Sequence, residues 1–311
     1  MTDNAIEIKN LRKIYDNKFE ALKGISLDIP KGSFYGLLGP NGAGKTTTIG
    51  AISGLVNYHN GSIKIMGYDN KKDYRTTRKL IGLSPQELNF DVFFPIKKVL
   101  EFQAGYYGLS YNKSKERTEL MLEQFGLKDK QNNSCRELSG GMKRRLQIAK
   151  ALIHDPEILI LDEPTDGLDP NQKNDVRQLI RKLGKQKAII ISTHILEEVT
   201  AICNRAMIIS NGKLLLDEKP KDLLKKSETY NSIFLSIEEK KLIDLKKDII
   251  KNKITSEVDI IDSFCVVRGK NPKLIKNKID DYIKKNKFTI NHYSVGNGNL
   301  EEVFRRLTAN E

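Results

Sequence analysis

The chain has 311 residues, of which 39% are hydrophobic and 30% are charged, and its formal net charge at pH 7 is +13. This length and apolar content can bury one large core and a small second core. No run approaches the 18 apolar residues of a membrane-spanning helix, and the N-terminus lacks a basic segment followed by an apolar core, so the sequence predicts neither a span nor a secretory signal.

The positive charge is spread along the chain, and the segment after Lys221 carries only its proportional share. We therefore expect no dedicated nucleic-acid groove, although attraction to an anionic membrane face would be a by-product. Cys135, Cys203 and Cys265 are odd in number and far apart. They favour reduced thiols over a disulfide framework.

The first elements in chain order are a strand-like alternation at residues 6–14, which Tyr15 follows, and a short apolar strand at residues 33–38. A glycine-rich loop, residues 39–46, comes next and leads into an apolar segment that reads as a helix. This is the context expected of a phosphate-binding loop, because the N-terminus of the helix would face the anion.

The chemistry of this loop explains its residues. Its backbone N–H groups can converge on phosphate oxygens, Lys45 can reach the β- and γ-phosphates, and the hydroxyl of Thr46 can ligate Mg²⁺. The residues predicted to bind nucleotide here are Gly39, Pro40, Asn41, Gly42, Ala43, Gly44, Lys45, Thr46 and Thr47. Such a loop by itself leaves kinases, GTPases and many ATPases open.

The next part of the chain, from about residue 87 to residue 155, is predicted to be helical. One helix begins at Pro95, another covers residues 114–125, and a third follows Ser139, which is a good N-cap. Ser139, Gly140 and Gly141 would lie at a helix N-terminus with free N–H groups, which makes a second anion site. Two such sites for one γ-phosphate indicate two polypeptides arranged head to tail.

From residue 156 to about 224 the pattern returns to alternating strands and helices, as a doubly wound sheet requires. The uninterrupted apolar run 158–161 is typical of a buried parallel strand and ends in Asp162 and Glu163. From these positions Asp162 can hold Mg²⁺ and Glu163 can polarise the attacking water. The strand 188–193 precedes His194, and Asn211-Gly212 predicts a hairpin turn.

After residue 224 the sequence becomes rich in lysine. It contains strand-like segments at residues 232–237 and 264–267, a helix from Pro272 to about Lys285, and a last strand near Phe288 to Tyr293. These features predict a small α+β domain at residues 225–311.

Taken together, these motifs resemble those of the ATP-binding subunit of an ABC transporter, and the similarity runs from about Ile6 to Leu224. By this resemblance Leu138 to Met142 is the signature motif, although Met142 stands where Gln is usual, and Asp166 stands where a small residue is common. The resemblance also implies roles for Tyr15 (adenine stacking), Gln86 (Mg²⁺ or attacking water), Asp169 (the D-loop residue, binding nucleotide) and His194 (γ-phosphate).

The resemblance implies an α/β P-loop NTPase fold with a mostly parallel sheet, an N-terminal antiparallel part and a helical subdomain, all within residues 1–224. It implies an ATPase that uses ATP and Mg²⁺, and a sandwich with a second copy of the chain or a homologous subunit. It also implies a separate membrane permease, and hence a cytoplasmic location on the inner face of the membrane. The C-terminal tail and the segment 105–108 favour the ABC-2 type exporters related to drug resistance.

In this family the helical subdomain docks the permease, and exposed aromatic residues would form the groove, unless they only pack helices together. They are Phe90, Phe93, Phe94, Tyr106 and Tyr107. Two other functions stay open. One is an ABC-type ATPase in translation or DNA repair, which usually has two nucleotide domains or a long coiled coil. The other is a P-loop kinase, which would not account for Leu138 to Met142 or His194.

Overall fold

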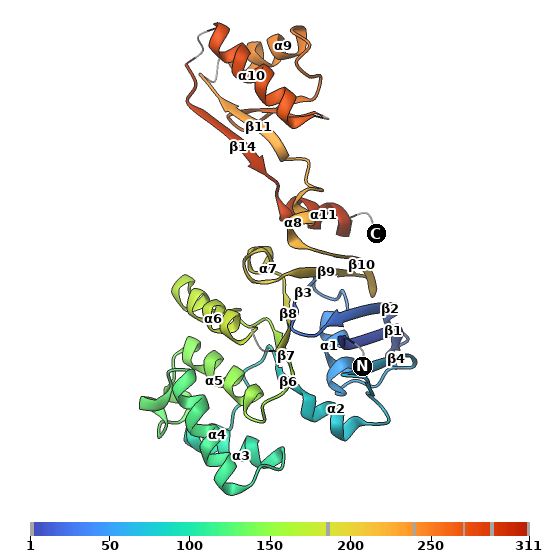
Figure 1. Ribbon diagram of the computed structural model, residues 1–311, viewed down its shortest axis with the longest axis vertical. Coiled ribbons are helices and arrows are strands. Elements are labelled where there is room, and N and C mark those ends of the chain that lie inside the picture. The colour runs from blue at the N-terminus through green and yellow to red at the C-terminus, as the bar shows by residue number, and fades with distance from the viewer. Residues whose placement is uncertain (1–2, 185–186, 239–240, 270, 287–288, 310–311) are drawn as a thin grey trace. The chain divides into compact units, whose positions relative to one another are not determined.

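The computed structural model describes residues 3–184, 187–238, 241–269, 271–286 and 289–309. Contacts within the chain divide it into two compact units, one up to Pro220 and one from Lys221 to Ala309 (Figure 1). None of the described helices is long and apolar enough to cross a lipid bilayer.

The N-terminal unit contains an antiparallel sheet that includes the alternating segment predicted at residues 6–14. Its strands, in spatial order, are β2 (Glu20–Pro30), β1 (Asn4–Ile14), β4 (Asn60–Ile65) and β5 (Tyr68–Asp69). From Ile6 to Lys9 the residues of β1 alternate between buried and more exposed positions, because one face of this sheet covers the core. The predicted antiparallel part is therefore confirmed.

A second, six-stranded sheet forms the centre of this unit. Its strands, in spatial order, are β10 (Lys213–Glu218), β9 (Arg205–Ser210), β3 (Phe34–Leu38), β8 (Ala188–Thr193), β7 (Ile158–Asp162) and β6 (Ile81–Ser84). All neighbours pair in parallel except β9 and β10. Asn211 and Gly212 both have positive φ between β9 and β10, as a tight hairpin turn requires. The mostly parallel sheet is confirmed.

The central sheet is buried on both faces, which explains why its strands are uninterrupted apolar runs. On β7, Ile158 and Ile160 belong to the core shared with the antiparallel sheet and α1. Their neighbours Leu159 and Leu161 belong to a second core on the opposite face, shared with α3 to α6. Side chains of a strand alternate between faces, so both sets must be apolar when both faces are covered. Figure 1 shows the two layers on either side of β6, β7 and β8.

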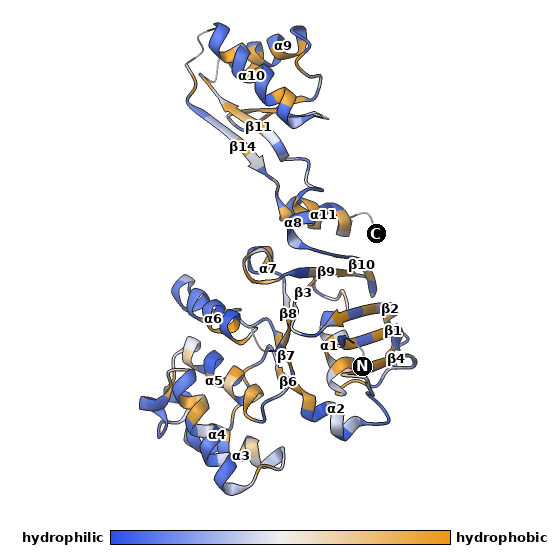
Figure 2. Cartoon of the chain, viewed as in Figure 1, coloured by the Kyte–Doolittle hydropathy of each residue, from blue (hydrophilic) through white to orange (hydrophobic). Residues whose placement is uncertain are grey.

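The helices of this unit include the predicted helical subdomain. They are α1 (Lys45–Ser53), α2 (Tyr74–Leu80), α3 (Ile96–Tyr106), α4 (Tyr111–Gln124), α5 (Gly140–Leu152), α6 (Pro170–Leu183) and α7 (Leu196–Ile202), with short 3₁₀ turns η1 (Lys128–Lys130) and η2 (Cys135–Glu137). The short α8 (Pro220–Leu224) lies at the division between the units. Helix α4 begins three residues before the predicted start, because the extended residue Ser110 occupies its N-cap position. Figure 2 shows hydrophilic residues predominating on α6, which buries only Val176 and Ile180.

The C-terminal unit is α+β. Its antiparallel sheet has the order β12 (Val258–Ile261), β13 (Phe264–Val267), β11 (Tyr230–Ser236), β14 (His292–Asn297), and its helices are α9 (Leu242–Lys251), α10 (Pro272–Asn286) and α11 (Leu300–Ala309). Sequence reasoning missed β12 and α9, although Leu242, Leu245 and Ile249 have helical spacing and are buried. The last strand begins at His292, later than predicted; Phe288 lies outside the described residues.

A close backbone approach joins the central sheet to the helical subdomain. A Cβ added to Gly82 on β6 would collide with the carbonyl oxygen of Ala151 on α5 and lie 2.9 Å from Pro156 Cγ. We expect Gly82→Ala to lower the free energy of unfolding by about 1–3 kcal/mol, because backbone atoms would have to move apart. Urea denaturation of the full chain measures this loss.

The matched control is Gly105→Ala near the end of α3. A Cβ there meets nothing within 4 Å, so the substitution is expected to stabilise the chain by up to about 1 kcal/mol through helix propensity. Equal effects of the two substitutions would contradict the proposed collision at Gly82.

Candidate functional site

The glycine-rich loop predicted to bind phosphate connects β3 to α1. Gly44, the N-cap of α1, has a φ of 107°, and a Cβ at that position would lie 2.8 Å from the carbonyl oxygen of Ala21. Glycine is therefore required both by the left-handed backbone and by the close approach. The loop directs the N-terminus of α1 toward a cavity, and no acidic residue lies in the first helical turn to oppose an anion.

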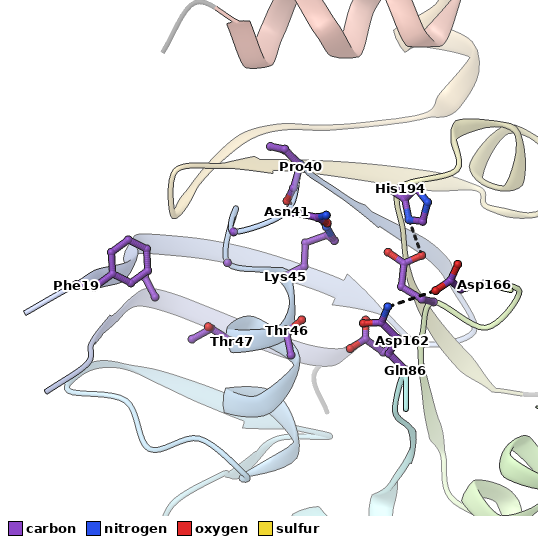
Figure 3. Close-up of a pocket in the computed structure, with 14 residues that line it drawn as sticks. Phe19, Pro40, Asn41, Lys45, Thr46, Thr47, Gln86, Asp162, Asp166 and His194 are labelled. Atoms are coloured by element: carbon purple, nitrogen blue, oxygen red, sulfur yellow. Dashed lines mark hydrogen bonds and ion pairs between the residues drawn. The ribbon is translucent and has the colours of Figure 1, made fainter. Parts of the chain in front are cut away.

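A cavity of about 510 Å³ opens beside this loop (Figure 3). Its lining residues come from the loop, from α1, from the start of β2 in the antiparallel sheet, from the end of β7 and from the segments that follow three strands of the central sheet. They are Phe19, Ala21, Pro40, Asn41, Gly42, Gly44, Lys45, Thr46, Thr47, Gln86, Asp162, Glu163, Asp166 and His194. Most of the residues predicted from separate motifs thus lie around one space. Gly39 and Ala43 belong to the loop but do not line the cavity, and Ala43 is buried beneath it.

Lys45 is buried within its own loop. Its Nζ donates to the carbonyl oxygens of Gly39 at 2.6 Å and Pro40 at 3.2 Å. Burial lowers the pKa of Lys45 below its ordinary value, an effect that the negative charges of Glu163 and Asp162 partly oppose. The ammonium group is therefore close to the strand-end carboxylates and is held by loop carbonyls that phosphate oxygens can replace.

Asp162 and Glu163 occupy the end of β7, and both are 6% exposed. Burial raises the pKa of Asp162, while the positive charges of Lys45 and Arg144 lower it. Glu163 has a positive φ of 48°, which turns the chain as the strand ends. Its N–H donates to the carbonyl oxygen of Ser192 at 2.9 Å, so the turn is fixed to β8.

His194 follows β8, lies in the cavity lining (Figure 3) and contacts Glu163. The distance between His194 Nδ1 and Glu163 Oε2 is 2.9 Å, which is a hydrogen bond when the ring nitrogen carries the proton. The His194 side chain is 54% exposed whereas that of Glu163 is 8% exposed. A buried carboxylate thus touches an imidazole that remains accessible from the cavity.

Gln86 and Asp166 close the same end of the cavity. Gln86 Nε2 lies 3.4 Å from Asp166 Oδ2, a contact drawn in Figure 3. Asp166 was singled out from the sequence only as a departure from a common pattern, and the structure places it in the lining. Phe19 was missed altogether, and its position four residues after Tyr15 gave no strong signal.

Tyr15 itself lies beside the cavity and does not line it. Its hydroxyl is 3.2 Å from Thr47 Oγ1, and Lys13 Nζ lies 4.8 Å from the ring centroid. Phe19, which is 55% exposed, provides the aromatic ring in the lining.

The predicted second anion site lies outside this cavity. Ser139 Oγ accepts from Met142 N at 3.3 Å and caps α5, and Gly140 and Gly141 form its first turn. Asp169 likewise caps α6, accepting from Gln172 N at 2.9 Å. Neither helix N-terminus therefore lines the cavity beside the lysine loop of its own chain.

The signature helix is nevertheless tied to Gln86. Arg144 on α5 is 4% exposed and donates from Nη1 to the carbonyl oxygen of Gln86 at 3.1 Å. Gln147, one turn further on, donates from Nε2 to the carbonyl oxygens of Pro85 at 2.7 Å and Glu87 at 2.8 Å. Sequence reasoning missed both residues, because only the fold brings α5 against this loop.

Comparisons with known proteins agree with this geometry. Residues 22–166 match the ABC transporter family model. The linearmycin resistance ATP-binding protein of Bacillus subtilis is 39% identical over 68% of this chain and 68% of its own length. The Nod factor export ATP-binding protein I of Burkholderia pseudomallei strain K96243 is 34% identical over 98% of this chain and 97% of its own length.

Two solved structures resemble the fold. The cbiO1 protein of Clostridium perfringens, described as part of an ABC transporter complex, aligns with a TM-score of 0.66 and 25% identity over 81% of this chain and 96% of its own. A dimeric ATP-binding cassette in a post-hydrolysis state, bound to ADP and phosphate, aligns with a TM-score of 0.63 and 27% identity over 69% of this chain and 98% of its own.

The burial of Asp162 predicts a pH-dependent cost to stability. Because its pKa in the fold is raised above the ordinary 3.8, the cost is absent below that pH and grows as pH rises through the folded pKa. Asp162→Asn should therefore increase the free energy of unfolding at pH 7, and the gain should shrink as the pH approaches 3.8. Urea denaturation across this range measures the difference, with exposed Asp175→Asn as the control. A gain that is largest at low pH would contradict the prediction.

Proposed function

The chain belongs to the ABC transporter family, as one of its ATP-binding and ATP-hydrolysing subunits, and on this premise we propose how its residues divide the work. The observation that supports the proposal best is the single cavity shared by Lys45, Asp162, Glu163 and His194. We assign the loop from Gly39 to Thr46 to the phosphates of ATP. The hydroxyl of Tyr15 contacts Thr47, and Phe19 lines the same cavity as Thr47, so we assign these two aromatic rings to stacking of the base.

The donor set also suits Mg²⁺. This ion takes oxygen ligands and is usually held by one or two carboxylates together with substrate phosphates and water. Asp162, Thr46 and Gln86 line the cavity with a carboxylate, a hydroxyl and an amide oxygen. Within the described residues no cluster of three or more acidic, His or Cys side chains forms a metal cage by itself. A site that is completed by nucleotide fits both facts, and the ion would neutralise phosphate charge there.

Hydrolysis requires a base that accepts a proton from the attacking water. Glu163 is assigned this role, because its carboxylate lies at the cavity wall and its contact with His194 holds one oxygen in a defined direction. His194, which is more exposed, is assigned to orient Glu163 and to contact the γ-phosphate. Lys45 and the N-terminus of α1 stabilise the charge on the transferring phosphoryl group.

We propose that two such chains, or one chain and a homologous subunit, enclose ATP between them. Ser139, Gly140, Gly141 and Asp169 lie outside the cavity of their own chain, at helix N-termini that suit an anion. A second subunit would bring its own copies of these residues to the nucleotide. The dimeric cassette with a similar fold supports this arrangement.

We further propose that the subunit drives a separate membrane permease, that it exports its cargo, and that it works at the cytoplasmic face of the membrane. The named relatives serve export and resistance. A cavity of about 570 Å³, lined by α2, β6 and α3, and a second of about 340 Å³ on the helical subdomain share Gln103 and Tyr106. Tyr106 is 85% exposed. Phe93 is 84% exposed and immediately precedes Phe94, which lines the second cavity. Phe93, Phe94 and Tyr106 form an exposed aromatic surface, which we name the permease-docking surface. It suits an apolar partner segment.

Not every aromatic residue predicted for this surface is free to dock a partner. The Tyr107 ring stacks on His154 with 3.5 Å between ring centroids, and Phe90 packs against the core of the helical subdomain. Tyr107 and Phe90 therefore also serve helix packing, whereas Phe93, Phe94 and Tyr106 are exposed.

Replacing Glu163 tests the catalytic assignment. Glu163→Gln keeps the volume of the side chain but removes the proton acceptor, so we expect ATP hydrolysis to fall by about 10²- to 10⁴-fold. ATP binding and the ATP-dependent dimer should persist. Phosphate release and gel filtration with ATP measure the two properties. Exposed Glu197→Gln is the control, and near-normal turnover in Glu163→Gln would refute the base assignment.

Replacing the exposed aromatic residues tests the permease-docking surface. We expect the double variant Phe93→Ala, Tyr106→Ala to hydrolyse ATP normally in isolation but to lose its association with a polytopic membrane protein in detergent-solubilised membranes. Tyr111→Ala is the matched control, because Tyr111 is also exposed but is not one of the aromatic residues of the permease-docking surface. Association with ribosomes or DNA in place of a membrane protein would favour the translation or repair function.

A further inference from the structure

One buried carboxylate outside the nucleotide cavity is joined to both loops that carry the reacting side chains. Glu198 on α7 is 1% exposed and does not line the cavity. Its Oε1 accepts from the hydroxyl of Thr165 and lies 3.4 Å from Nη2 of Arg177 on α6. Its Oε2 accepts from the hydroxyl of Thr193 at 2.9 Å. Three separate elements therefore meet at this one side chain.

The burial of Glu198 calls for a physical reason. Removing a carboxylate from water costs several kcal/mol unless partners compensate it, and an apolar side chain of similar size would fill the same space without that cost. Here both carboxylate oxygens are hydrogen-bonded and a guanidinium group is nearby. What the carboxylate provides, and an apolar residue would not, is a directional connection between its partners.

The two threonines flank the residues assigned to catalysis. Thr165 is two residues after Glu163, and Thr193 immediately precedes His194. The hydroxyl oxygen of Thr193 also accepts from Ile195 N at 3.0 Å, so the side chain before His194 is bonded to the backbone of the residue after it. Glu198 thus connects the segment after β7 to the end of β8, the same two segments whose side chains meet at the 2.9 Å contact between Glu163 and His194.

We propose that Glu198 is a positioning residue that sets the distance and direction between Glu163 and His194 by holding Thr165 and Thr193. The proposal rests on the roles assigned above to Glu163 and His194. Glu198 acts through the two threonines and touches neither the cavity nor the nucleotide. The Glu163–His194 pair then has two connections, one through its own side chains and one through the buried carboxylate behind it.

The threonine hydroxyls allow a test that leaves the buried charge in place. Thr193→Val and Thr165→Val keep the side-chain shape but remove the hydrogen bond to Glu198. We expect the kcat for ATP hydrolysis to fall by about tenfold to a hundredfold, because small misplacements of catalytic groups have effects of this size. The KM for ATP should stay within about twofold, because the phosphate loop is not changed. Thr193→Ser and Thr165→Ser retain a hydroxyl and should restore most of the rate.

Thr200→Val is the matched control. Thr200 lies on α7 as well, but it is exposed and its hydroxyl donates to the carbonyl oxygen of Glu197. It should hydrolyse ATP at the normal rate. Normal kcat in both threonine-to-valine variants at positions 165 and 193, or failure of the serine variants to restore the rate, would overturn the proposal.

A double-mutant cycle separates positioning from general stability. In a His194→Ala background, Thr193→Val should cause no further loss of kcat, because the group that it positions is already gone. A loss that multiplies with that of His194→Ala would mean that Thr193 supports the fold alone, and would also overturn the proposal. If His194→Ala and Glu163→Gln themselves hydrolyse ATP normally, the site assignment under "Proposed function" fails instead, so the two failures are distinguishable.

Discussion

The parallel register of β3, β7 and β8 is the constraint on which the rest of this molecule depends. These strands are buried on both faces, so their hydrogen bonds and side chains fix them against one another. Because they run in the same direction, their carboxyl ends meet at one edge. The phosphate loop, the Asp162–Glu163 pair and His194 each follow one of these ends, and a rigid sheet thereby assembles a site from three distant segments.

The buried charged side chains at this edge of the sheet compensate one another only in part. Lys45 has a lowered pKa and Asp162 a raised one, both because burial disfavours their charged forms. Arg144 approaches the same carboxylates from α5 and is buried too, and burial lowers its pKa. A site that is costly to keep charged without ligand gains from the arrival of nucleotide phosphates and a cation, which suits the ATP-bound dimer proposed above.

Contacts behind the cavity connect its parts. Arg144 and Gln147 join the signature helix to the backbone of the Gln86 loop. Glu198 joins the segments that follow β7 and β8. Movement of the helical subdomain relative to the central sheet would therefore be transmitted to Gln86 through these hydrogen bonds. The Glu163–His194 pair, in contrast, is held by contacts between the segments at the ends of β7 and β8. This arrangement would let the Glu163–His194 pair keep its geometry while the helical subdomain moves, which suits an ATPase.

The sequence by itself determined the family, the fold class, the strands β3, β7 and β8 of the central sheet and the place of the glycine-rich loop between β3 and α1. Glycine loops, apolar runs and helix caps are local patterns, and local sterics and hydrogen bonding are enough to specify them. Only the tertiary structure decided that Phe19 and Asp166 line the cavity, that Tyr15 lies beside it, and that Glu198 connects two strand ends. Those facts depend on which distant segments pack together. No local pattern in β12, in α9 or around Arg144 specifies which distant residues that segment contacts, because packing acts on the whole chain at once.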